Sequence, residues 1–406
     1  MKAIIKPSTA KGIIKAPPSK SIAHRMLICA GLSQQKSIIR GIAPSKDILA
    51  TLDCLSAIGA SYTYENSCVK IKGGRLGSEE NTYDFKCREC GSTLRFFIPI
   101  ALLTDHRSVF SGSETLMNRP LSVYEDIAEE KGYLFEKGRE GIVVKGSLTS
   151  GVYRVKGNIS SQFISGLLFA LPLVKGDSKI ELIPPIESIS YINMTLQALK
   201  LFGIDAGWEN ESTLYVKGDQ EYKGIDGEVE GDYSNAAFLE ALNLAGGNVR
   251  VTGLDKESLQ GDKVYSEYFE KIKNGNAVLD IANCPDLGPV LFAAAALLGG
   301  AKFTGTRRLR IKESDRAQAM KEELSKFGIN VDAEENSVYV HGGKIKAPIG
   351  ELCGHNDHRI VMALSNIAVK TGAVIDGAQA IDKSFPDFFD KLKALGIEVE
   401  INGMDK

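Results

Sequence analysis

Phe202-Gly203-Ile204, followed by Thr213-Leu214-Tyr215-Val216-Lys217-Gly218, is the stretch that decides the fold. It comes at the end of an amphipathic segment that starts near Leu196. Glycine at such a place is typical of a left-handed helix C-cap. The β-branched and aromatic residues after it are typical of strands. The stretch therefore predicts a helix that ends near Gly203 and continues into a hairpin.

The same pattern recurs along the chain. The other copies span residues 51–60 with 67–73, 127–133 with 141–146, 268–272 with 278–281, 324–329 with 337–342, and 392–401. The copy at 268–281 is blurred, and the last one is truncated. Their irregular spacing argues against a stacked solenoid. Six helix-and-strand units, three in each half, predict two similar lobes with a boundary near residues 228–232. The alternative is that the pattern is simply common in α/β proteins.

Composition is ordinary for a globular protein, with 43% hydrophobic and 25% charged residues in a chain of 406, long enough for two cores. A formal charge of −2 argues against a general nucleic-acid binder, so an anion site must come from local clustering. Seven cysteines without framework spacing predict reduced thiols in the cytoplasm. Residues 1–10 lack a signal-peptide core, and the longest apolar run, 290–298, is too short to span a membrane.

Residues 17–25, Pro-Pro-Ser-Lys-Ser-Ile-Ala-His-Arg, form the first candidate anion site. The prolines fix an extended entry, and the apolar run that follows predicts a helix with Ser19 or Ser21 as its N-cap. Lys20 would then lie at the helix N-terminus, where backbone N–H groups already favour anions. Arg25 lies about one turn further and is suited to bidentate anion binding. The alternative is a capped surface helix with solvated charges.

The same combination of a polar turn, a cation and an apolar helix recurs elsewhere. The turns comprise residues 88–95, 160–162, 314–316, 355–359 and 383–387, and the cations are Lys20, Arg25, Arg95, Arg119, Lys312, Arg316, Arg359 and Lys383. Hydroxyls of Ser160, Ser161, Ser188 and Tyr191 lie at further helix starts. Each feature alone is also explained by capping or a solvated ion pair. Together they predict one cleft between two lobes, filled by small and highly anionic substrates.

A carboxylate and two possible metal motifs complete the candidates. Asp286 lies in the Pro-flanked turn 284–289 before an Ala-rich helix, where it is either an N-cap or a general base among the cations. Cys87 and Cys90 form a CxxC pair without a second pair or a histidine at ligand spacing. His355 and His358 also lack a supporting ligand set. We therefore expect no metal and no cofactor.

The chain closely resembles the 5-enolpyruvylshikimate-3-phosphate synthases, carboxyvinyl transferases of the shikimate pathway. The matching segments are PSKSIAHR, ECGSTLR, NRP, SSQF, SISY, GDYSNAAF, CPDLGP, KESDR, NDHR and DKSFPDFF, in the family's order from residue 18 to 389. The resemblance implies an α/β fold, a two-lobed inside-out barrel of six βαβαββ units, three per lobe. It also implies a first lobe of residues 1–17 plus 231–406, a second lobe of residues 18–230, and an active site in the cleft between them.

The implied reaction moves the enolpyruvyl group of phosphoenolpyruvate to the 5-hydroxyl of shikimate 3-phosphate and releases phosphate. By resemblance, Asp286 accepts the hydroxyl proton, Glu313 protonates the methylene carbon, and Lys20 touches both substrates. The residues implied for shikimate 3-phosphate are Lys20, Ser21, Arg25, Ser160, Ser161, Gln162, Ser188, Tyr191, Asp286 and Lys312. Those implied for phosphoenolpyruvate are Lys20, Gly91, Arg95, Arg119, Gln162, Arg316, His358, Arg359 and Lys383. The implied partners are these two small molecules, with no nucleic acid and no membrane, for a cytoplasmic monomer.

Two positions depart from the family pattern, and two alternatives stay open. Arg308 stands where some members have asparagine, and Glu89-Cys90 stands where others have small or amide side chains. The related UDP-N-acetylglucosamine enolpyruvyl transferases share the fold but typically carry a cysteine in the loop that corresponds to residues 113–119, which contain none here. A non-catalytic anion-binding relative, or one that processes RNA ends, is the alternative from another class.

Overall fold

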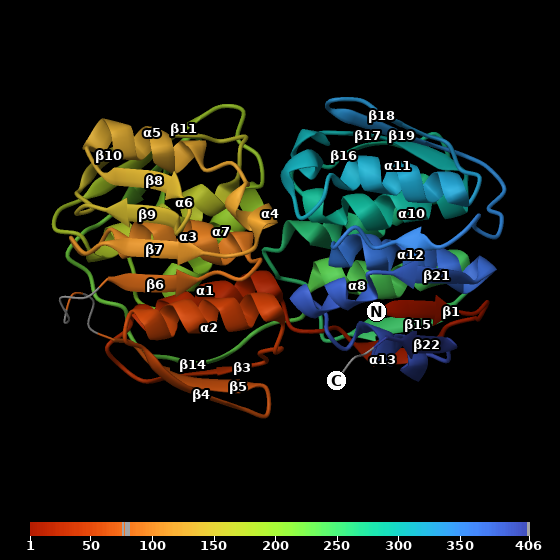
Figure 1. The fold of residues 1–406 in the computed structure, drawn as a ribbon, viewed down its shortest axis with the longest axis horizontal. Helices are drawn as coiled ribbons and strands as arrows, with labels where there is room; N and C mark the ends of the chain where they lie inside the picture. Colours follow the sequence, from red (N-terminus) through yellow and green to blue (C-terminus); the bar gives the residue numbers. More distant parts are fainter. Residues whose placement is uncertain (75–76, 78–81, 404–406) are drawn as a thin grey trace. The chain divides into compact units, whose positions relative to one another are not determined.

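The computed structural model describes residues 1–74, 77 and 82–403. The chain divides into two compact units: unit 1 comprises residues 1–17 and 231–406, and unit 2 comprises residues 18–230. In Figure 1, unit 2 runs from red through yellow into green, and unit 1 contains the red N-terminal strands together with the green, cyan and blue remainder of the chain. Each unit mixes helices with several small sheets, so the chain has a mixed α/β fold.

The described residues of unit 2 form three four-stranded sheets, ordered β14-β3-β5-β4, β6-β7-β9-β8 and β10-β11-β13-β12. Their strands are β3 (Ser37–Arg40), β4 (Ser61–Glu65), β5 (Cys68–Lys72), β6 (Tyr83–Lys86), β7 (Ser108–Ser111), β8 (Leu134–Gly138), β9 (Gly141–Lys145), β10 (Gly151–Lys156), β11 (Ser178–Ile183), β12 (Ala206–Asn210), β13 (Thr213–Val216) and β14 (Asp226–Glu228). The helices are α1 (Lys20–Leu32), α2 (Lys46–Ala57), α3 (Gly91–Ala101), α4 (Glu114–Met117), α5 (Ser122–Lys131), α6 (Ser161–Ala170), α7 (Ile189–Leu201) and the short 3-10 helix η1 (Leu171–Leu173).

The three sheets of unit 2 have one topology. In each, the first two strands are parallel, as in β6 with β7, and the remaining pairs are antiparallel. A parallel pair needs a crossover connection, which a helix supplies, whereas the antiparallel pair β8–β9 closes as a hairpin. Strand β14, at the end of the unit 2 segment, pairs with β3 and so completes the first sheet. Each sheet with its two helices is therefore one βαβαββ unit.

Unit 1 repeats this plan with one incomplete member. Its strands are β1 (Lys2–Ile5), β2 (Lys11–Lys15), β15 (Asn248–Thr252), β16 (Val278–Asp280), β17 (Gly300–Thr304), β18 (Val331–Ala333), β19 (Ser337–His341), β20 (Leu352–Cys353), β21 (Ala373–Asp376) and β22 (Val399–Asn402). Its helices are α8 (Tyr233–Glu240), α9 (Tyr265–Lys273), α10 (Gly288–Leu298), α11 (Arg316–Lys326), α12 (His358–Thr371) and α13 (Phe388–Ala394), with the 3-10 helices η2 (Ala241–Ala245), η3 (Gly261–Val264), η4 (Pro285–Leu287), η5 (Arg307–Ile311) and η6 (Ala378–Lys383).

The sheets of unit 1 are ordered β16-β17-β19-β18, β20-β21-β1-β22 and β15-β2. The truncated sixth copy is completed by β1, which pairs antiparallel with both β21 and β22. The fourth copy differs from the expectation. Its proposed hairpin strand is β16, which instead lies parallel to β17 and begins the fifth unit. The fourth unit therefore has only the parallel pair β15–β2 among the described residues, which explains its blurred pattern.

The predicted helix ends are confirmed at the glycines of the other five copies. Gly59, Gly132, Gly203, Gly328 and Gly396 have φ between 74° and 86°. This is the left-handed region that glycine adopts without a steric cost. Each glycine therefore stops its helix where the sequence pattern places the end.

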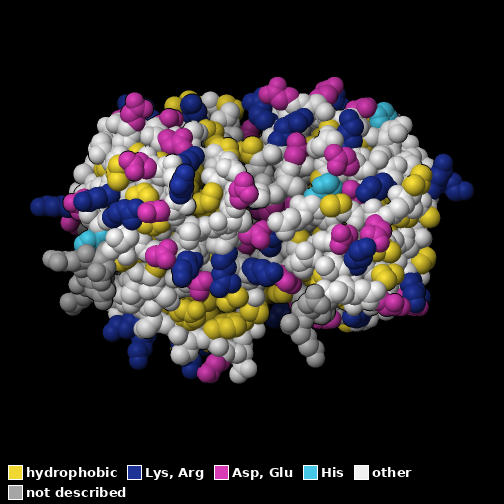
Figure 2. Space-filling view, in the orientation of Figure 1, with side chains coloured by type: hydrophobic (Ala, Val, Ile, Leu, Met, Phe, Trp, Pro, Cys, Tyr) yellow, Lys and Arg dark blue, Asp and Glu magenta, His cyan; other side chains and the backbone are white. Residues whose placement is uncertain are grey.

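Several helices are buried almost all round, as expected for helices at the centre of a core. All the residues of α10 from Gly288 to Ala296 are buried, as are those of α12 from His358 to Val369, and α3 is buried except at Ser92. No helix among residues 1–74, 77 and 82–403 is both long and apolar enough to cross a membrane. Figure 2 shows charges of both signs mixed over the visible face of each unit. An anion site must therefore come from clusters at particular helix starts.

Candidate active site

Lys20 is the first residue of α1, and Ser19 is the N-cap, one of the two caps that the sequence predicts. The Lys20 ammonium donates to Asp47 Oδ2 at 2.7 Å, and the two side chains are only 15% and 13% exposed. Asp47 lies in the first turn of α2. The cation at the start of α1 is thus held in place by a carboxylate that sequence reasoning did not identify.

Arg25 is buried within α1, with 3% of its surface exposed. Its Nε donates to Thr195 Oγ1 at 2.8 Å, and its two Nη groups donate to the carbonyls of Ser21 and Tyr191 at 2.7 and 3.0 Å and to Ser165 Oγ at 3.5 Å. The guanidinium also lies 5.6 Å from the centre of the Phe96 ring. Burial lowers the pKa of Arg25 to about 10, so the group remains charged at neutral pH. Among the described residues, the hydrogen-bond partners of Arg25 are all neutral oxygens, and a buried cation in such surroundings attracts an anion strongly.

Gly91 begins α3 and brings two arginines close together. A Cβ at this position would lie 2.6 Å from Arg119 Nη1 and 3.1 Å from Arg95 Nη1. Both arginines are at least nine-tenths buried. The two guanidinium groups repel each other. Both of them, and the N-terminus of the helix beside them, favour a bound anion. The absence of a side chain at Gly91 leaves the space that this arrangement needs.

Gln162 links α6 to the same arginines. Its Oε1 accepts from Arg95 Nη1 at 2.7 Å, and its Nε2 donates to Ser92 Oγ at 2.8 Å. Ser160 is the N-cap of α6, and its hydroxyl accepts from the Gln162 amide at 3.3 Å. Ser161 is buried at the first helical position. Ser160 therefore caps α6, and the same helix start places the Gln162 side chain beside Arg95.

Ser188 and Tyr191 lie at the start of α7. Ser188 is the N-cap residue, in the left-handed conformation with φ 58°. The Tyr191 carbonyl accepts from Arg25, and its ring lies 5.9 Å from the Arg25 guanidinium. We call Lys20, Arg25, Gly91, Arg95, Arg119 and Gln162 the unit 2 cluster. The structure brings together in it the polar starts of α1, α3 and α6 from three separate repeats.

In unit 1, Asp286 is surrounded by cations. Its Oδ1 accepts from Lys312 Nζ at 3.2 Å and from Arg316 Nη1 at 2.9 Å, and its Oδ2 accepts from Arg359 Nη2 at 3.0 Å. Burial raises the pKa of this carboxyl, but the opposing charges of Arg359, Lys312 and Arg316 outweigh burial and hold it well below its usual range. The N-cap of α10 is Leu287, so the alternative of Asp286 as a plain N-cap is wrong.

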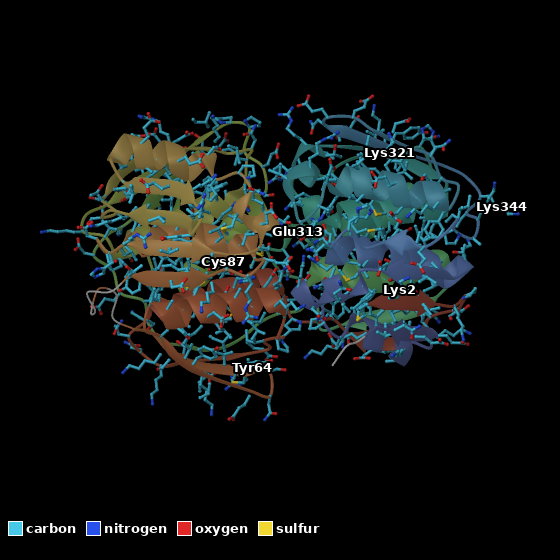
Figure 3. All side chains as sticks on the ribbon, viewed as in Figure 1. Lys2, Tyr64, Cys87, Glu313, Lys321 and Lys344 are labelled. Carbon is cyan, nitrogen blue, oxygen red and sulfur yellow. The ribbon has the colours of Figure 1, made fainter. Side chains whose placement is uncertain are left out.

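Arg316 is the first residue of α11 and is 1% exposed. Besides Asp286, it donates to Glu313 Oε2 at 2.7 Å and through Nε to Asp357 Oδ2 at 2.8 Å. Burial alone would lower its pKa, but the three carboxylates raise it above the usual range. Glu313, labelled in Figure 3, is therefore fixed three residues before the helix by a salt bridge. The N-cap is Asp315, within the predicted polar turn 314–316.

The start of α12 adds further cations to the same place. Asp357 is its N-cap and accepts from the Arg359 amide at 2.9 Å while it binds Arg316. The Arg359 side chain also donates to Ser234 Oγ. The Lys383 ammonium donates to the Asn356 carbonyl at 2.7 Å, which brings the end of η6 beside this turn.

Two further buried side chains lie in unit 1. His358 is 2% exposed, with its Nδ1 3.8 Å from Asp357 Oδ1. Arg308, a departure from the family pattern, is buried and donates to the Ala282 carbonyl. This hydrogen bond links η5 to the backbone just before η4. We call Asp286, Lys312, Glu313, Arg316, Asp357 and Arg359 the unit 1 cluster.

Sequence reasoning found the cations and missed what holds them. Asp47, Thr195, Ser165, Asp357 and Ser234 were not among the candidates, although each contacts one of them. Asp357 alone had a local signal, since it immediately precedes the apolar run of α12. Chemically, each cluster offers buried cations at helix starts, and the unit 1 cluster adds carboxylates that can move protons.

The comparisons with known proteins show the family of the chain as a whole. The model of the EPSP synthase (3-phosphoshikimate 1-carboxyvinyltransferase) family matches residues 4–392. The chain belongs to the EPSP synthase family. Among its relatives, the 3-phosphoshikimate 1-carboxyvinyltransferase of Clostridium acetobutylicum is 42% identical and that of Clostridium kluyveri is 39% identical. The alignments cover 97% of both chains in the first case, and 98% of this chain and 97% of the relative in the second.

Solved structures support the EPSP synthase fold. Two structures of EPSP synthase from Acinetobacter baumannii match this chain with TM-scores of 0.77 and 0.78. They are 23% and 22% identical to it and cover 98% and 99% of its length, and all of each matched chain is covered. This likeness confirms the fold expected from the sequence, with six related units.

Proposed function

We propose that the chain transfers the enolpyruvyl group of phosphoenolpyruvate to the 5-hydroxyl of shikimate 3-phosphate and releases phosphate. It would thereby serve chorismate and aromatic amino acid biosynthesis in the shikimate pathway. Family membership and near full-length relatives at about 40% identity support this function. The observation that carries the chemistry is Asp286, whose two carboxylate oxygens accept from three cations.

The two clusters have complementary roles in this proposal. Arg25, with Ser21, Ser160, Ser161, Ser188 and Tyr191 around it, binds shikimate 3-phosphate. Phosphoenolpyruvate is bound by the cations beside Gly91, together with Gln162, and by those of unit 1: Arg316, His358, Arg359 and Lys383. Lys20 contacts both substrates. Two substrates that each carry a phosphate and a carboxylate repel one another, so cations fixed in advance are what brings them together.

The reaction then proceeds by addition and elimination. Asp286 accepts the proton of the 5-hydroxyl group while the hydroxyl oxygen bonds to the central carbon of phosphoenolpyruvate. Glu313 donates a proton to the methylene carbon. Lys312 stabilises the hydroxyl region. The resulting tetrahedral intermediate loses phosphate, which takes the proton from Asp286. The new methyl group returns a proton to Glu313 as the double bond forms again. Atoms and charge balance without a metal or cofactor.

Substrate binding tunes Asp286 for this step. In the free protein, three cations hold its pKa well below the usual range, which makes the carboxylate a weak base. Anionic substrate groups that bind Lys312, Arg316 and Arg359 offset these charges and raise the pKa of Asp286. The carboxylate thus becomes a competent base only when substrate is present.

Phosphate release with both substrates tests the proposal. We expect phosphate only when phosphoenolpyruvate and shikimate 3-phosphate are both supplied, and none with UDP-N-acetylglucosamine as acceptor. Shikimate without its phosphate is the matched control. Turnover with UDP-N-acetylglucosamine would favour the related transferase instead, and absence of turnover with any acceptor would favour a non-catalytic anion-binding protein.

We further propose that the two clusters act on one pair of substrates, brought together when anions offset the repulsion between cations. Small-angle scattering should then give a smaller radius of gyration with shikimate 3-phosphate and the phosphoenolpyruvate mimic glyphosate, and an unchanged radius would contradict this.

We also propose a cytoplasmic monomer with no nucleic-acid or membrane partner. Light scattering on the purified protein measures its mass, and a dimer mass would reject the monomer.

A further inference from the structure

Three side chains of types that can bind a metal ion lie close together next to Lys20. His24 on α1, Asp47 on α2 and Cys90 at the start of α3 each offer a ligand atom, and these atoms all lie within 4.8 Å of one another. His24 Nε2 is 4.0 Å from Cys90 Sγ. From spacing along the chain alone, we expected no histidine partner for Cys90. The fold supplies one from 66 residues away.

We propose that His24, Asp47 and Cys90 bind a thiophilic divalent cation such as Zn²⁺, and that the bound ion inhibits the enzyme by taking Asp47 from Lys20. Thiolate, imidazole and carboxylate are the ligands that Zn²⁺ takes in proteins. Three protein ligands leave a fourth position for water. The ion is not needed for turnover.

His24 is prepared as a ligand by its surroundings. Its Nδ1 lies 2.7 Å from Thr51 Oγ1, and Thr51 in turn lies 2.8 Å from Thr93 Oγ1. A metal-binding histidine usually donates its other ring N–H to such an oxygen, which leaves the Nε2 lone pair for the metal. Burial, with the nearby charges of Lys20 and Arg25, holds the pKa of His24 well below its usual range. The imidazole is therefore neutral, as a metal ligand must be.

The distances require little movement. Bonds of about 2.0–2.3 Å to a tetrahedral zinc ion place neighbouring ligand atoms roughly 3.5 Å apart. His24 and Cys90 are 1% and 2% exposed, whereas the side chain of Asp47 is 13% exposed and faces the Lys20 ammonium. Burial raises the pKa of Cys90 to about 12, so the free protein carries the thiol. On binding, the S–H bond breaks, a zinc–sulfur bond forms and the proton passes to solvent.

Lys20 is the target of the inhibition. Its ammonium is fixed by Asp47 at 2.7 Å. A bound dication takes over the carboxylate and repels the ammonium, so Lys20 loses the position from which it would reach both substrates. This consequence rests on the proposed function, whereas binding of the ion does not.

Cobalt titration tests the site without substrate. Co²⁺ bound to a thiolate gives a sulfur-to-cobalt charge-transfer band, and we expect that band to saturate at one equivalent of Co²⁺. A Cys353→Ser background removes the exposed cysteine beside the second metal-compatible group of the described residues, Glu322, Glu323 and His355. In that background, Cys90→Ser should abolish the band and His24→Asn should weaken binding at least tenfold. Cys87→Ser is the matched control and should bind normally.

Turnover provides the second readout. Zn²⁺ should inhibit the unsubstituted enzyme, chelator should reverse the inhibition, and Cys90→Ser should turn over normally while resisting Zn²⁺. No charge-transfer band, or a band that persists in Cys90→Ser, would overturn the proposed site. Thermal melts establish that both variants are folded. Loss of Co²⁺ binding in both Cys90→Ser and His24→Asn would show that the loss does not come from misfolding of one variant. If Co²⁺ binds but no acceptor is turned over, the proposed function fails and the site stands.

Discussion

Arg25 in unit 2 and Arg316 in unit 1 are both buried, and their surroundings differ in charge. Arg25 donates to hydroxyl and carbonyl oxygens and lies beside aromatic rings, whereas Arg316 donates to Asp286, Glu313 and Asp357. Burial lowers the pKa of Arg25, while the carboxylates raise that of Arg316. Arg25 thus carries a buried positive charge that no carboxylate among the described residues offsets. Arg316 is instead paired with carboxylates, among them Asp286 and Glu313, to which we assign the proton transfers.

Asp286→Ala should give the largest effect, because it removes the proposed proton acceptor from the unit 1 cluster. A general base contributes about 10²–10⁴-fold in rate, so kcat should fall by that factor. Shikimate 3-phosphate should still bind, since a negative charge has left the site. Steady-state kinetics and calorimetry measure the two effects, and Asp286→Asn is the control that preserves the shape of the side chain. Normal turnover in either variant would remove Asp286 from the chemistry.

Stability sharpens the contrast between the two arginines. Arg316→Met leaves three carboxylates without their shared cation, and breaking a buried ion pair in this way costs about 3–5 kcal/mol of unfolding free energy. Arg25→Met removes a buried charge that has no carboxylate partner among the described residues, so it should be neutral or stabilising. Thermal melts followed by circular dichroism compare the two variants. Equal destabilisation would mean that Arg25 is a structural cation like Arg316.

Arg25→Ala should act on binding more than on turnover. A hydrogen bond to a charged group contributes about 1.5–3 kcal/mol, which corresponds to a roughly 10- to 100-fold rise in KM for shikimate 3-phosphate. The fall in kcat should be smaller. Arg25→Lys keeps the charge but not the planar fork, and should recover only part of the affinity. A larger loss of kcat than of KM would give Arg25 a role in the chemical step.

Gly91→Ala tests the close approach of two arginines in unit 2. The added Cβ would lie 2.6 Å from Arg119 Nη1, so this guanidinium must move. We expect KM for phosphoenolpyruvate to rise on the order of tenfold, with little change in KM for shikimate 3-phosphate. Gly138→Ala is the control for a glycine substitution, because a Cβ added at Gly138 would have no atom within 4 Å. Equal effects on both substrates would show that the arginines do not serve phosphoenolpyruvate alone.

The smallest effect is expected for Cys87→Ser combined with Cys90→Ser. Neither thiol takes part in the proposed reaction, so turnover should stay within about twofold and survive chelator, since no step of the mechanism uses a metal. Phosphate release with and without chelator measures this. Activity that is lost in chelator and restored by Zn²⁺ would instead make the metal essential.

The sequence predicted those parts of the fold and the site that depend on short stretches. Glycine at positions such as Gly203 and Gly328 marks helix ends because left-handed backbone is a local property. Lys20, Arg316 and Arg359 were found because a cation next to a polar turn and an apolar run is visible in a few residues. The fourth hairpin was misassigned because an apolar run such as 278–281 looks the same in a parallel and an antiparallel pair.

Contacts between residues that are far apart in the chain could not be predicted from the sequence. Asp357 contacts Arg316 from 41 positions away, Thr195 contacts Arg25 from 170, and His24 contacts Cys90 from 66. None of these partners is marked by local spacing, and only the stacking of repeats brings them together. The charged residues of the clusters can therefore be found from local sequence, whereas the fold decides which of these charges are paired.

Strand β1 makes the folding of unit 1 depend on the order of synthesis. It is an inner strand of its sheet, yet both neighbours, β21 and β22, come from residues 373–376 and 399–402. The ribosome therefore makes β1 long before either partner exists, and all of unit 2 is synthesised in between. Each strand described in unit 2 has its partners within residues 18–230, so this unit can fold first. Unit 1 must keep an apolar strand unpaired until the end, which makes its completion the slow and aggregation-prone step of biogenesis.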